Sequence, residues 1–595
     1  MSNANALTLS GAVSGTGALA KTGVGTLTLS GSNSYTGTTS VTSGTLSIAS
    51  DDNLGSGALT LNGGALSVTG SSVTIDNAVS LGSSGGSVSN ANAVRLSGAI
   101  SGTGALIKEG AGTLSLSGIN TYTGATTVSA GILTVSGGSA ISDTSAVTVA
   151  SGATFELSTD ASETVGSIAG AGNIVANGGT LTVGGDNTST TFSGVILEGP
   201  SGLTLNKVGS GTLTLSGSNT YSGNTIVLGG GLSISGDSNL GSGALTLNSG
   251  TLSVTGNGST IDNAITLINS GVLNLNAGVA ATFSGVVSGS GGLLKTGGGT
   301  ATLSGTNTYS GATVLNGGTL SVSGALNGTS QVTVNSGATL AGSGSIFAAN
   351  STNTLTVNDG SFLAPGVSGS NNGVGALTVN GHLVLNGTLK ADLTGASAGT
   401  DYDQVVVAGD VTLGANSAFD IAYSVTSSGN TFTLIDKQGV NAITGTLSGV
   451  AEGGTLTSNS HSFQTSYVGG TGNDITLKDN AAPVITSGAT GSVDENADTS
   501  TVIYTATATD ADNDSLTYSL SGTDAALLNI NASTGAVTLK NSADYETKNT
   551  YSFNLVVTDS SSGHLTDTKA VTVSVNDLND NSPVMTSGAT GSVNE

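Results

Sequence analysis

The feature that most constrains this chain is a sequence block that occurs four times in its first 322 residues. The first copy reads KTGVGTLTLSGSNSYTG, and the copies begin at Lys21, Lys108, Lys207 and Lys295. A shorter spacing of 19 or 20 residues lies within the block and around it, because Leu27 returns as Leu46 and then as Leu66. Apolar residues alternate with Thr or Ser, which is the two-residue period of a strand with one buried face. The pattern predicts short strands in coils of about 20 residues.

A coil of this length has no room for a helix and cannot bury its own apolar face. Stacked coils would share one continuous core of Leu, Val and Ile, so we expect an all-β fold that begins with a parallel β-solenoid. About 480 residues at this spacing give some 24 coils.

Three kinds of polar residue recur at equivalent corners of the coils. Asparagine, which tolerates the left-handed backbone conformation, is expected to adopt it there, at Asn33, Asn120, Asn219 and Asn307. The tyrosines are expected to act as wedges in preference to stacking on sugars, at Tyr35, Tyr122, Tyr221 and Tyr309. The four repeated lysines are expected to be solvated or packed along their stems, without a catalytic role.

Composition excludes several classes of protein. The 595 residues include 95 glycines and no cysteine, which excludes a mainly helical fold, disulfides and thiol chemistry. With 36 acidic and 11 basic residues, the net charge of −25 argues against nucleic acid and anionic lipid as partners. Calcium remains open, because it prefers clustered oxygen ligands. No membrane-spanning helix and no signal peptide is recognisable in the sequence.

An enzymatic reading of the solenoid rests on one pair of carboxylates. Asp401 and Asp403 would share a face if they lay on a strand, as a glycosidase pair could. A solvated loop before a buried strand is the simpler interpretation. The chain has a single arginine, Arg95, and its three histidines are scattered, so we expect no enzyme. The segment GGTGNDITL at 469–477 is close to a calcium nonapeptide, but we interpret it as the last solenoid turn.

The fourfold block resembles the passenger-associated repeat of bacterial autotransporters. The resemblance covers residues 1–322, and the segments around residues 364–366 and 375–407 are similar to the C-terminal part of such passengers. It implies a right-handed parallel β-helix at the bacterial surface, with residues 323–480 as its continuation.

The C-terminal part of the chain has a different period. PVITSGATGSV at 483–493 returns as PVMTSGATGSV at 583–593, which is a repeat of 100 residues. This length and its alternating apolar pattern predict a seven-stranded β-sandwich. Acidic residues gather where the expected strands end, and only three lysines are available to balance them. A divalent cation is the natural compensating charge.

These motifs resemble the cadherin repeat, with one repeat at 481–582 and the start of a second at 583–595. The resemblance implies Ca²⁺ ligands in two groups. At the C-terminal junction they are Glu495, Asp544, Glu546, Asp577, Asn579, Asp580 and Asn581. At the N-terminal junction they are Asp510, Asp512 and Asp559. The linker before the repeat, residues 479–482, lacks the full Asp-x-Asn-Asp-Asn motif, which weakens the expectation of a metal at the second group.

Together these features predict a calcium-binding adhesin that is secreted or displayed on the bacterial cell surface, in association with the outer membrane. The expected partners are further cadherin-like repeats and a surface ligand, homophilic or glycan. The alternative is a carbohydrate-active β-helix enzyme with an adhesive C-terminal region.

Overall fold

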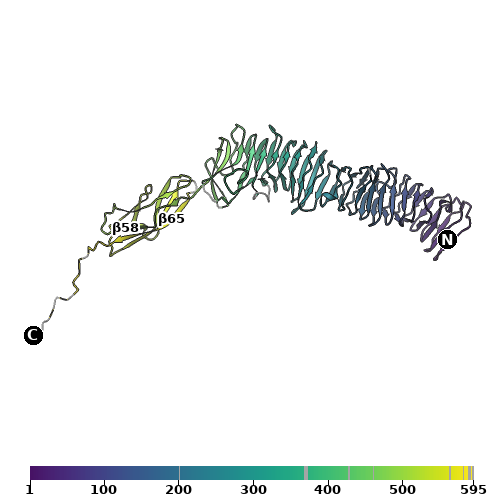
Figure 1. Ribbon diagram of the computed structural model, residues 1–595, viewed down its shortest axis with the longest axis horizontal. Helices are drawn as coiled ribbons and strands as arrows, with labels where there is room; N and C mark the ends of the chain where they lie inside the picture. Colours follow the sequence, from purple (N-terminus) through teal and green to yellow (C-terminus); the bar gives the residue numbers. More distant parts are fainter. Residues whose placement is uncertain are drawn as a thin grey trace. The chain divides into compact units, whose positions relative to one another are not determined.

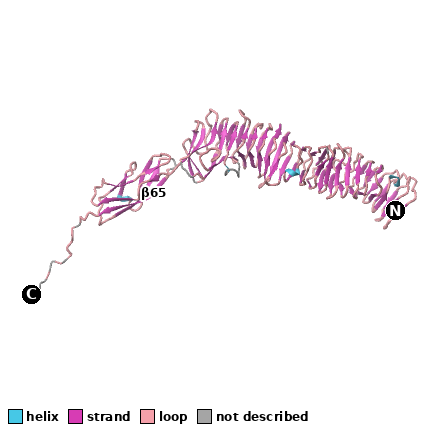
Figure 2. Ribbon diagram, in the orientation of Figure 1, coloured by secondary structure: helices cyan, strands magenta, loops and turns pink. Residues whose placement is uncertain are grey.

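The structure is a computed structural model of the 595-residue chain. It describes residues 1–199, 201–366, 373–425, 429–459, 461–561, 564–580, 582–586, 588 and 591. The fold is all-β, as predicted, and strands dominate the described chain (Figure 2). Its helical turns include the short η1 (Asp51–Asn53), η2 (Asp237–Asn239) and η4 (Ala525–Leu527). In the described ranges no helix has the length and apolar character needed to cross a membrane.

The chain packs as two compact units. The first contains Met1–Ala391, Asp403–Asp420 and Ile435–Ser448. The second contains Asp392–Tyr402, Ile421–Leu434 and Gly449–Glu595. Three strands contribute residues to both units: β49 (Thr388–Leu393), β52 (Ala418–Tyr423) and β53 (Thr431–Lys437). The predicted boundaries at residues 322, 480 and 582 follow sequence similarity and stay a prediction.

The first unit is a parallel β-solenoid whose stacked coils are visible in Figure 1. Its longest sheet has 20 strands. They are β1 (Leu7–Leu9), β3 (Thr26–Leu29), β5 (Thr45–Ile48), β7 (Ala65–Val68), β10 (Gly86–Asn90), β13 (Leu106–Glu109), β15 (Thr126–Val128), β17 (Ala146–Val149), β20 (Ser167–Gly170), β23 (Thr190–Phe192), β26 (Thr212–Leu215), β28 (Gly231–Ile234), β30 (Thr251–Val254), β33 (Ser270–Leu275), β36 (Gly292–Thr296), β39 (Thr313–Leu315), β42 (Val332–Val334), β45 (Thr354–Val357), β48 (His382–Leu385) and β51 (Val411–Leu413).

Shorter parallel ladders form the other faces of the coils. One five-stranded sheet contains β2 (Leu19–Lys21), β4 (Thr39–Val41), β6 (Leu59–Leu61), β9 (Val79–Leu81) and β12 (Ile100–Gly102). A seven-stranded sheet contains β8 (Val73–Ile75), β11 (Val94–Leu96), β14 (Thr113–Leu116), β16 (Ile132–Val135), β18 (Thr154–Leu157), β21 (Asn173–Ala176) and β24 (Ile196–Glu198). Another contains β19 (Glu163–Val165), β22 (Thr180–Val183), β25 (Thr204–Lys207), β27 (Thr225–Val227), β29 (Leu245–Leu247), β32 (Ile265–Leu267) and β35 (Val287–Gly289).

Two further ladders follow later in the chain. One includes β31 (Ser259–Ile261), β34 (Ala280–Phe283), β37 (Thr300–Leu303), β40 (Gly318–Val322), β43 (Ala338–Gly342) and β46 (Phe362–Pro365). The other includes β38 (Thr306–Asn307), β41 (Ala325–Leu326), β44 (Ser345–Ile346), β47 (Ala376–Val379) and β50 (Gln404–Val407).

The apolar alternation sets the register of the coils. Leu27 lies over Leu46, and Leu46 over Leu66, all three fully buried. The Thr and Ser residues between the apolar positions face outward. Each buried leucine contributes about 1.5–3 kcal/mol relative to an exposed one, so the stack is stabilised coil by coil.

The prediction of some 24 coils is too high, because the longest sheet has 20 strands. The coils lengthen toward the C-terminus. Leu355 pairs with Leu383, and Leu383 with Val411, so each of these coils takes 28 residues. Longer loops between strands add residues without adding ladder positions.

The corner asparagines do not adopt the expected left-handed conformation, since none of the four has a positive φ. Asn120, Asn219 and Asn307 are buried and Asn33 is half-buried, and they bridge neighbouring coils instead. Asn120, for example, accepts a hydrogen bond from the amide of Ile100 at 2.7 Å and donates one to the carbonyl of Ala140 at 2.7 Å. Unpaired backbone groups at a buried corner are costly, so the amide side chain is needed there for its hydrogen bonds.

We expected the segment 469–477 to be the last turn of the solenoid, and this prediction is wrong. It joins β55 (His461–Gly469) to β56 (Asp474–Asp479), which pair antiparallel, and β55 also pairs antiparallel with β54 (Thr455–Ser458). The carboxylate of Asp474 closes this hairpin by accepting a hydrogen bond from the amide of Thr471 at 2.8 Å.

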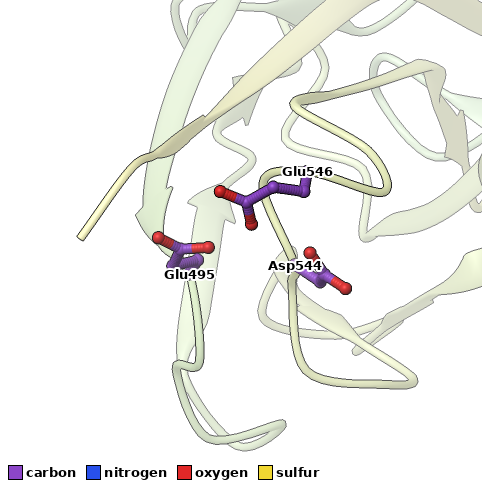
Figure 3. Close-up of side chains that lie close together, drawn as sticks. All are labelled: Glu495, Asp544 and Glu546. Atoms are coloured by element: carbon purple, nitrogen blue, oxygen red, sulfur yellow. The ribbon is translucent and has the colours of Figure 1, made fainter. Parts of the chain in front are cut away.

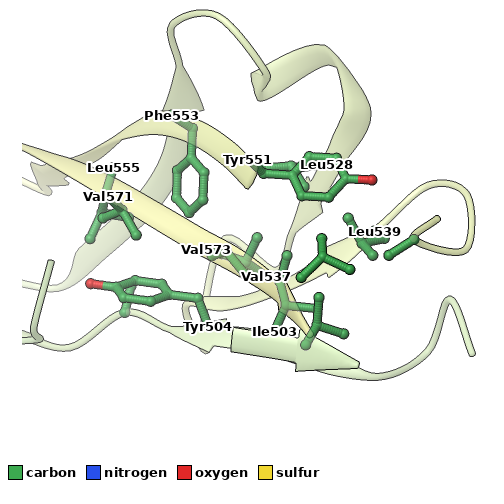
Figure 4. Packing of buried hydrophobic residues seen from close by; sticks show 14 of the residues in the cluster. Ile503, Tyr504, Leu528, Val537, Leu539, Tyr551, Phe553, Leu555, Val571 and Val573 are labelled. Atoms are coloured by element: carbon green, nitrogen blue, oxygen red, sulfur yellow. The ribbon is translucent and has the colours of Figure 1, made fainter. Parts of the chain in front are cut away.

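The described residues between Val484 and Asn576 form a β-sandwich. Its strands are β57 (Val484–Ile485), β58 (Thr490–Asp494), β59 (Val502–Thr505), β60 (Ala508–Thr509), β61 (Leu516–Ser521), β62 (Leu528–Ile530), β63 (Ala536–Leu539), β64 (Thr550–Asp559) and β65 (Thr566–Asn576). The sheet orders are β58-β65-β64-β61 and β59-β63-β62, with a short β57-β60 pair. The predicted seven strands result if β57 with β58, and β59 with β60, are each counted as one interrupted strand. Figure 4 shows the core between the sheets, which includes Tyr504 and Phe553. The ring centroids of these two residues lie 6.0 Å apart, and the rings are edge to face.

Candidate metal sites

Acidic side chains gather at both ends of the sandwich. The first group, which we call the C-terminal cluster, consists of Glu495, Asp544 and Glu546 (Figure 3). One ligand oxygen of each lies within 4.8 Å of the others. Glu495 follows β58, whereas the other two lie on the loop between β63 and β64. The fold therefore brings together carboxylates that lie about 50 residues apart in the sequence, as the resemblance implied.

Glu495 is the buried member of the C-terminal cluster, with 2% of its surface exposed. It accepts hydrogen bonds from the amides of Tyr545 at 3.1 Å and Leu578 at 2.5 Å. These bonds connect the loop that carries Asp544 and Glu546 to the segment after β65. Glu495 is thus held in place by the backbone on either side of it.

Charge accumulates around Glu546. A backbone hydrogen bond lowers the pKa of its carboxyl, but desolvation and the charges of Glu495, Asp577 and Asp580 raise it, and the net direction is upward. These carboxylates are therefore close enough to repel one another, and a divalent cation between them would relieve that repulsion.

Of the rest of the predicted C-terminal set, the described residues Asp577, Asn579 and Asp580 are exposed. Asp580 accepts a hydrogen bond from the side-chain amide of Asn496 at 2.5 Å, and Asp577 accepts one from the amide of Asn579 at 2.7 Å. Asn579 has a left-handed φ of 52°, which turns the chain there. Asn581, also predicted as a ligand, lies outside the described residues.

The second group, which we call the N-terminal cluster, consists of Asp510, Asp512, Asp514 and Asp559. Ligand oxygens of the first three lie within 4.8 Å of one another. Desolvation and the charges of Asp510, Asp559 and Asp512, in that order, raise the pKa of Asp514. Asp514 was not assigned as a ligand from the sequence, although its spacing of two residues from Asp512 was a visible signal.

In three aspartates of the N-terminal cluster, one carboxylate oxygen is held by hydrogen-bond donors. Asp559, which is 2% exposed, accepts bonds through Oδ1 from the hydroxyl of Ser561 at 2.6 Å and the amide of Leu565 at 3.0 Å. Asp510 accepts one through Oδ1 from the amide of Asp512 at 2.8 Å, and Asp512 accepts one through Oδ2 from the amide of Ala481 at 2.7 Å.

The second oxygen of each of these three aspartates is buried without a hydrogen-bond donor among the described residues. These atoms are Asp510 Oδ2, Asp512 Oδ1 and Asp559 Oδ2. Asp512 Oδ1 forms an ion pair with the ammonium group of Lys478 at 3.5 Å but accepts no hydrogen bond. A buried carboxylate oxygen without a partner is costly, and Ca²⁺ coordinates six to eight such oxygens. The side chains of the N-terminal cluster therefore fit Ca²⁺ better than the incomplete linker motif suggested.

The remaining candidate residues from the sequence lie in the solenoid and in the loop before β50. Asp403 is buried and accepts a hydrogen bond from the amide of Gly375 at 2.7 Å, whereas Asp401 accepts one from the amide of Ser397 at 3.1 Å. Both carboxylates lie before β50 and bond to loop amides. The four repeated tyrosines are buried wedges, as predicted, and each hydroxyl is paired with a threonine at 2.6–2.7 Å.

The sequence left open whether the four repeated lysines are solvated or packed along their stems, and the structure shows that they are not solvated. They are 0–1% exposed, and their ammonium groups point into the coil corners. Lys295 donates hydrogen bonds to the carbonyls of Thr296 at 2.8 Å, Gly297 at 3.0 Å and Gly317 at 3.3 Å. The ammonium group thus satisfies carbonyls of two successive coils, which explains why the lysine recurs with the block.

By its fold the protein is an all-β chain with a parallel solenoid followed by a two-sheet sandwich with acidic ends. Comparison with known proteins gives the families of these two parts. Residues 19–48, 106–135, 205–234 and 293–322 match the passenger-associated-transport-repeat family. Residues 489–576 match the cadherin domain. The chain therefore contains four passenger-associated-transport repeats and one cadherin domain.

The adhesin BmaC autotransporter of Brucella suis biovar 1 (strain 1330) is 32% identical over 214 residues. The match covers 33% of this chain and 6% of that protein, so the chain corresponds to a small part of its relative. Among solved structures, human protocadherin-24 EC1-2 is 32% identical and covers 18% of this chain and 48% of its own, with a TM-score of 0.17. Drosophila N-cadherin EC1-4 is 21% identical and covers 21% of this chain and 33% of its own, also with a TM-score of 0.17. The cadherin assignment rests on the family match.

Proposed function

We propose that this chain is a non-enzymatic adhesin segment, displayed on or secreted from the bacterial cell, whose cadherin repeat binds Ca²⁺. The observation that carries the proposal is the set of three buried carboxylate oxygens without donors in the N-terminal cluster. The passenger-type repeats and the similarity to an autotransporter adhesin support a location outside the cell. In this proposal residues 1–480 are a spacer or display rod, and residues 481–582 are the calcium module.

Calcium has a mechanical role in this proposal. The N-terminal cluster binds the ion between the two sheets' loops and the segment that precedes the repeat. The C-terminal cluster, with Asp577, Asn579, Asp580 and Asn581, binds it where the chain leaves the repeat. An ion that binds only the ordered arrangement stabilises it, and affinities of about 0.1–1 mM are typical of extracellular modules. Calcium then limits the motion of the repeat relative to its neighbours.

Adhesion by beads that carry the full chain tests the proposal. We expect the beads to aggregate with one another, or to bind a glycan array, in 2 mM Ca²⁺ and to lose this binding in chelator. Asp510→Asn with Asp512→Asn, which leaves the C-terminal cluster intact, should strongly reduce the calcium dependence. Asp401→Asn with Asp403→Asn, a matched loss of two carboxylates, should leave the dependence intact. Adhesion that is equal with and without Ca²⁺ would contradict the proposal, and so would glycan cleavage that Asp401→Asn removes.

A further inference from the structure

A lysine lies beside the N-terminal cluster within the C-terminal unit. Lys478 is in β56, the last strand before the sandwich, and its Nζ lies 3.5 Å from Oδ1 of Asp512. This is one of the buried oxygens that receives no hydrogen bond. The ammonium group therefore approaches the carboxylate at the position that a metal ion would also occupy.

The two partners differ greatly in their freedom to move. The Lys478 side chain is 40% exposed, whereas that of Asp512 is 2% exposed. Asp512 is also fixed through Oδ2 by the amide of Ala481, three residues after the lysine. Lysine side chains have several rotatable bonds and readily return to solvent, so Lys478 can move away while Asp512 stays in place.

One lysine does not neutralise this site. Desolvation and the charges of the three neighbouring aspartates of the cluster raise the pKa of Asp514 there. The charge of Lys478 opposes their effect and lowers the pKa of Asp514. A cavity next to the cluster, of about 130 Å³, is lined by Lys478, Asp479, Asn480, Asp514, Ser560 and Ser561, together with residues of β54 and β55. It offers room for an ion and its water ligands.

We propose that Lys478 is a built-in competitor for Ca²⁺ at the N-terminal cluster. In the absence of the ion its ammonium group partly compensates the buried carboxylates, and the ion displaces it into solvent. This inference rests on the proposed function, because it assumes that the cluster binds Ca²⁺. As a consequence, the cadherin repeat at 481–582 stays ordered at low calcium concentration, but the N-terminal cluster binds Ca²⁺ less tightly.

Electrostatics gives the expected size of the effect. The ion must break an ion pair with atoms 3.5 Å apart, and in a water-like dielectric the loss of such a pair weakens binding by about five- to tenfold. We therefore expect Lys478→Met to increase the calcium affinity of the N-terminal cluster by about five- to tenfold. Lys478→Arg keeps the charge and should stay close to the unchanged protein.

Calorimetric titration of the full chain with CaCl₂ tests this inference. A Glu495→Gln and Glu546→Gln background removes the C-terminal cluster, so that the heat reports the N-terminal cluster. Lys390→Met is the charge-matched control, because Lys390 is exposed and lies over the ring of Phe362 at 4.3 Å. Lys478→Gln provides a second neutral variant if the methionine variant does not fold.

Thermal unfolding of the same proteins gives an independent result. With chelator, the repeat of Lys478→Met should unfold several degrees below the unchanged repeat; with 5 mM Ca²⁺ this deficit should disappear. Equal calcium affinities of the unchanged and neutral variants would overturn the competition while leaving calcium binding intact. If the background protein binds no Ca²⁺ and neither neutral variant does, the proposed calcium site itself is wrong.

Discussion

Glu163 lies inside the solenoid at the start of β19, with 2% of its surface exposed. Burial raises the pKa of its carboxyl to about 7, hydrogen bonds from the amides of Ile141 and Ala140 oppose this rise, and Asp143 adds to it. It also acts on Tyr122, whose pKa is raised mainly by burial. The carboxylate accepts a hydrogen bond from the amide of Ile141 at 2.7 Å. Like the corner asparagines, it pairs a buried backbone group of a neighbouring coil.

The shift makes the stability of the solenoid depend on pH. Between pH 4.5 and about 7 the folded state holds a proton on Glu163 that the unfolded chain has released. The free energy of unfolding therefore falls as the pH rises through this window, by about 3 kcal/mol. In Glu163→Gln this fall should be absent, so its melting temperature should exceed that of the unchanged protein more at pH 8 than at pH 5.

Circular dichroism of the solenoid transition measures this difference. Glu156→Gln is the control for loss of a carboxylate, because Glu156 lies on β18 and accepts a hydrogen bond from the Thr134 hydroxyl at 2.9 Å outside the core. Parallel pH profiles for Glu163→Gln and the unchanged protein would contradict the account.

Lys295 offers a second test at the scale of one residue. Lys295→Met preserves the stem but removes the donor from three carbonyls at a buried corner. We expect the free energy of unfolding to fall by about 2–4 kcal/mol, because a buried carbonyl that loses its donor is desolvated without a compensating hydrogen bond. Hydrogen exchange should accelerate in the coils from residue 292 to 318, while exposed Lys390→Met has no effect. Unchanged exchange in these coils would show that the ammonium group is dispensable.

The sequence predicted these positions only in part. Recurrence with the block correctly indicated structural roles for the tyrosines and lysines, because a ligand site has no reason to repeat in every copy. The conformation of Asn120 and the burial of Lys295 were not predicted. Both depend on which carbonyls the neighbouring coil presents, and a residue's own sequence context does not contain that information.

At the scale of the element, close contact between coils requires glycine at defined places. A Cβ on Gly241 would overlap the carbonyl oxygen and the ring of Tyr221 in the preceding coil, and Gly55 has the same relation to Tyr35. Tyrosine and glycine are therefore one packing unit, in which the ring of one coil lies against the bare backbone of the next. This explains why the segment around Gly55 returns around Gly241.

We expect Gly241→Ala to destabilise the solenoid by about 1–3 kcal/mol, because the added methyl group meets backbone that cannot yield. Gly17→Ala is the matched control, since nothing lies within 4 Å of a Cβ at that position. Its effect should be within about 0.5 kcal/mol. The measurement is the midpoint of denaturant unfolding, and equal midpoints for the two variants would exclude the contact as a determinant of stability.

Strands were easier to predict than their pairing. The Thr-Leu-Thr-Leu alternation defined the ladder positions, and Leu27, Leu46 and Leu66 lie in the predicted register. The hairpin of β55 and β56 was missed, because its Gly-rich turn has the same composition as a solenoid corner. In the sandwich, acidic residues at strand ends predicted both clusters, whereas the contact between Lys478 and Asp512 involves a strand from outside the repeat.

At the scale of the whole molecule, two repeat systems divide the tasks. The solenoid has few charges and a core that extends by addition of coils, so each coil is stabilised mainly by its neighbours. The cadherin domain concentrates carboxylates at its ends, and its stability should depend on what binds there. The overestimated number of coils shows the limit of a single period, because the 28-residue coils after Leu355 contain the same strands with longer loops.

The central claim is that the cadherin domain binds Ca²⁺ through the clusters described above. Crystals of the chain grown in millimolar CaCl₂ and measured for anomalous scattering would test it most directly. We expect anomalous peaks within about 2.3–2.6 Å of the oxygens of Asp510, Asp512 and Asp559, and of Glu495, Asp544 and Glu546. A well-ordered domain without a peak at either cluster would contradict the account.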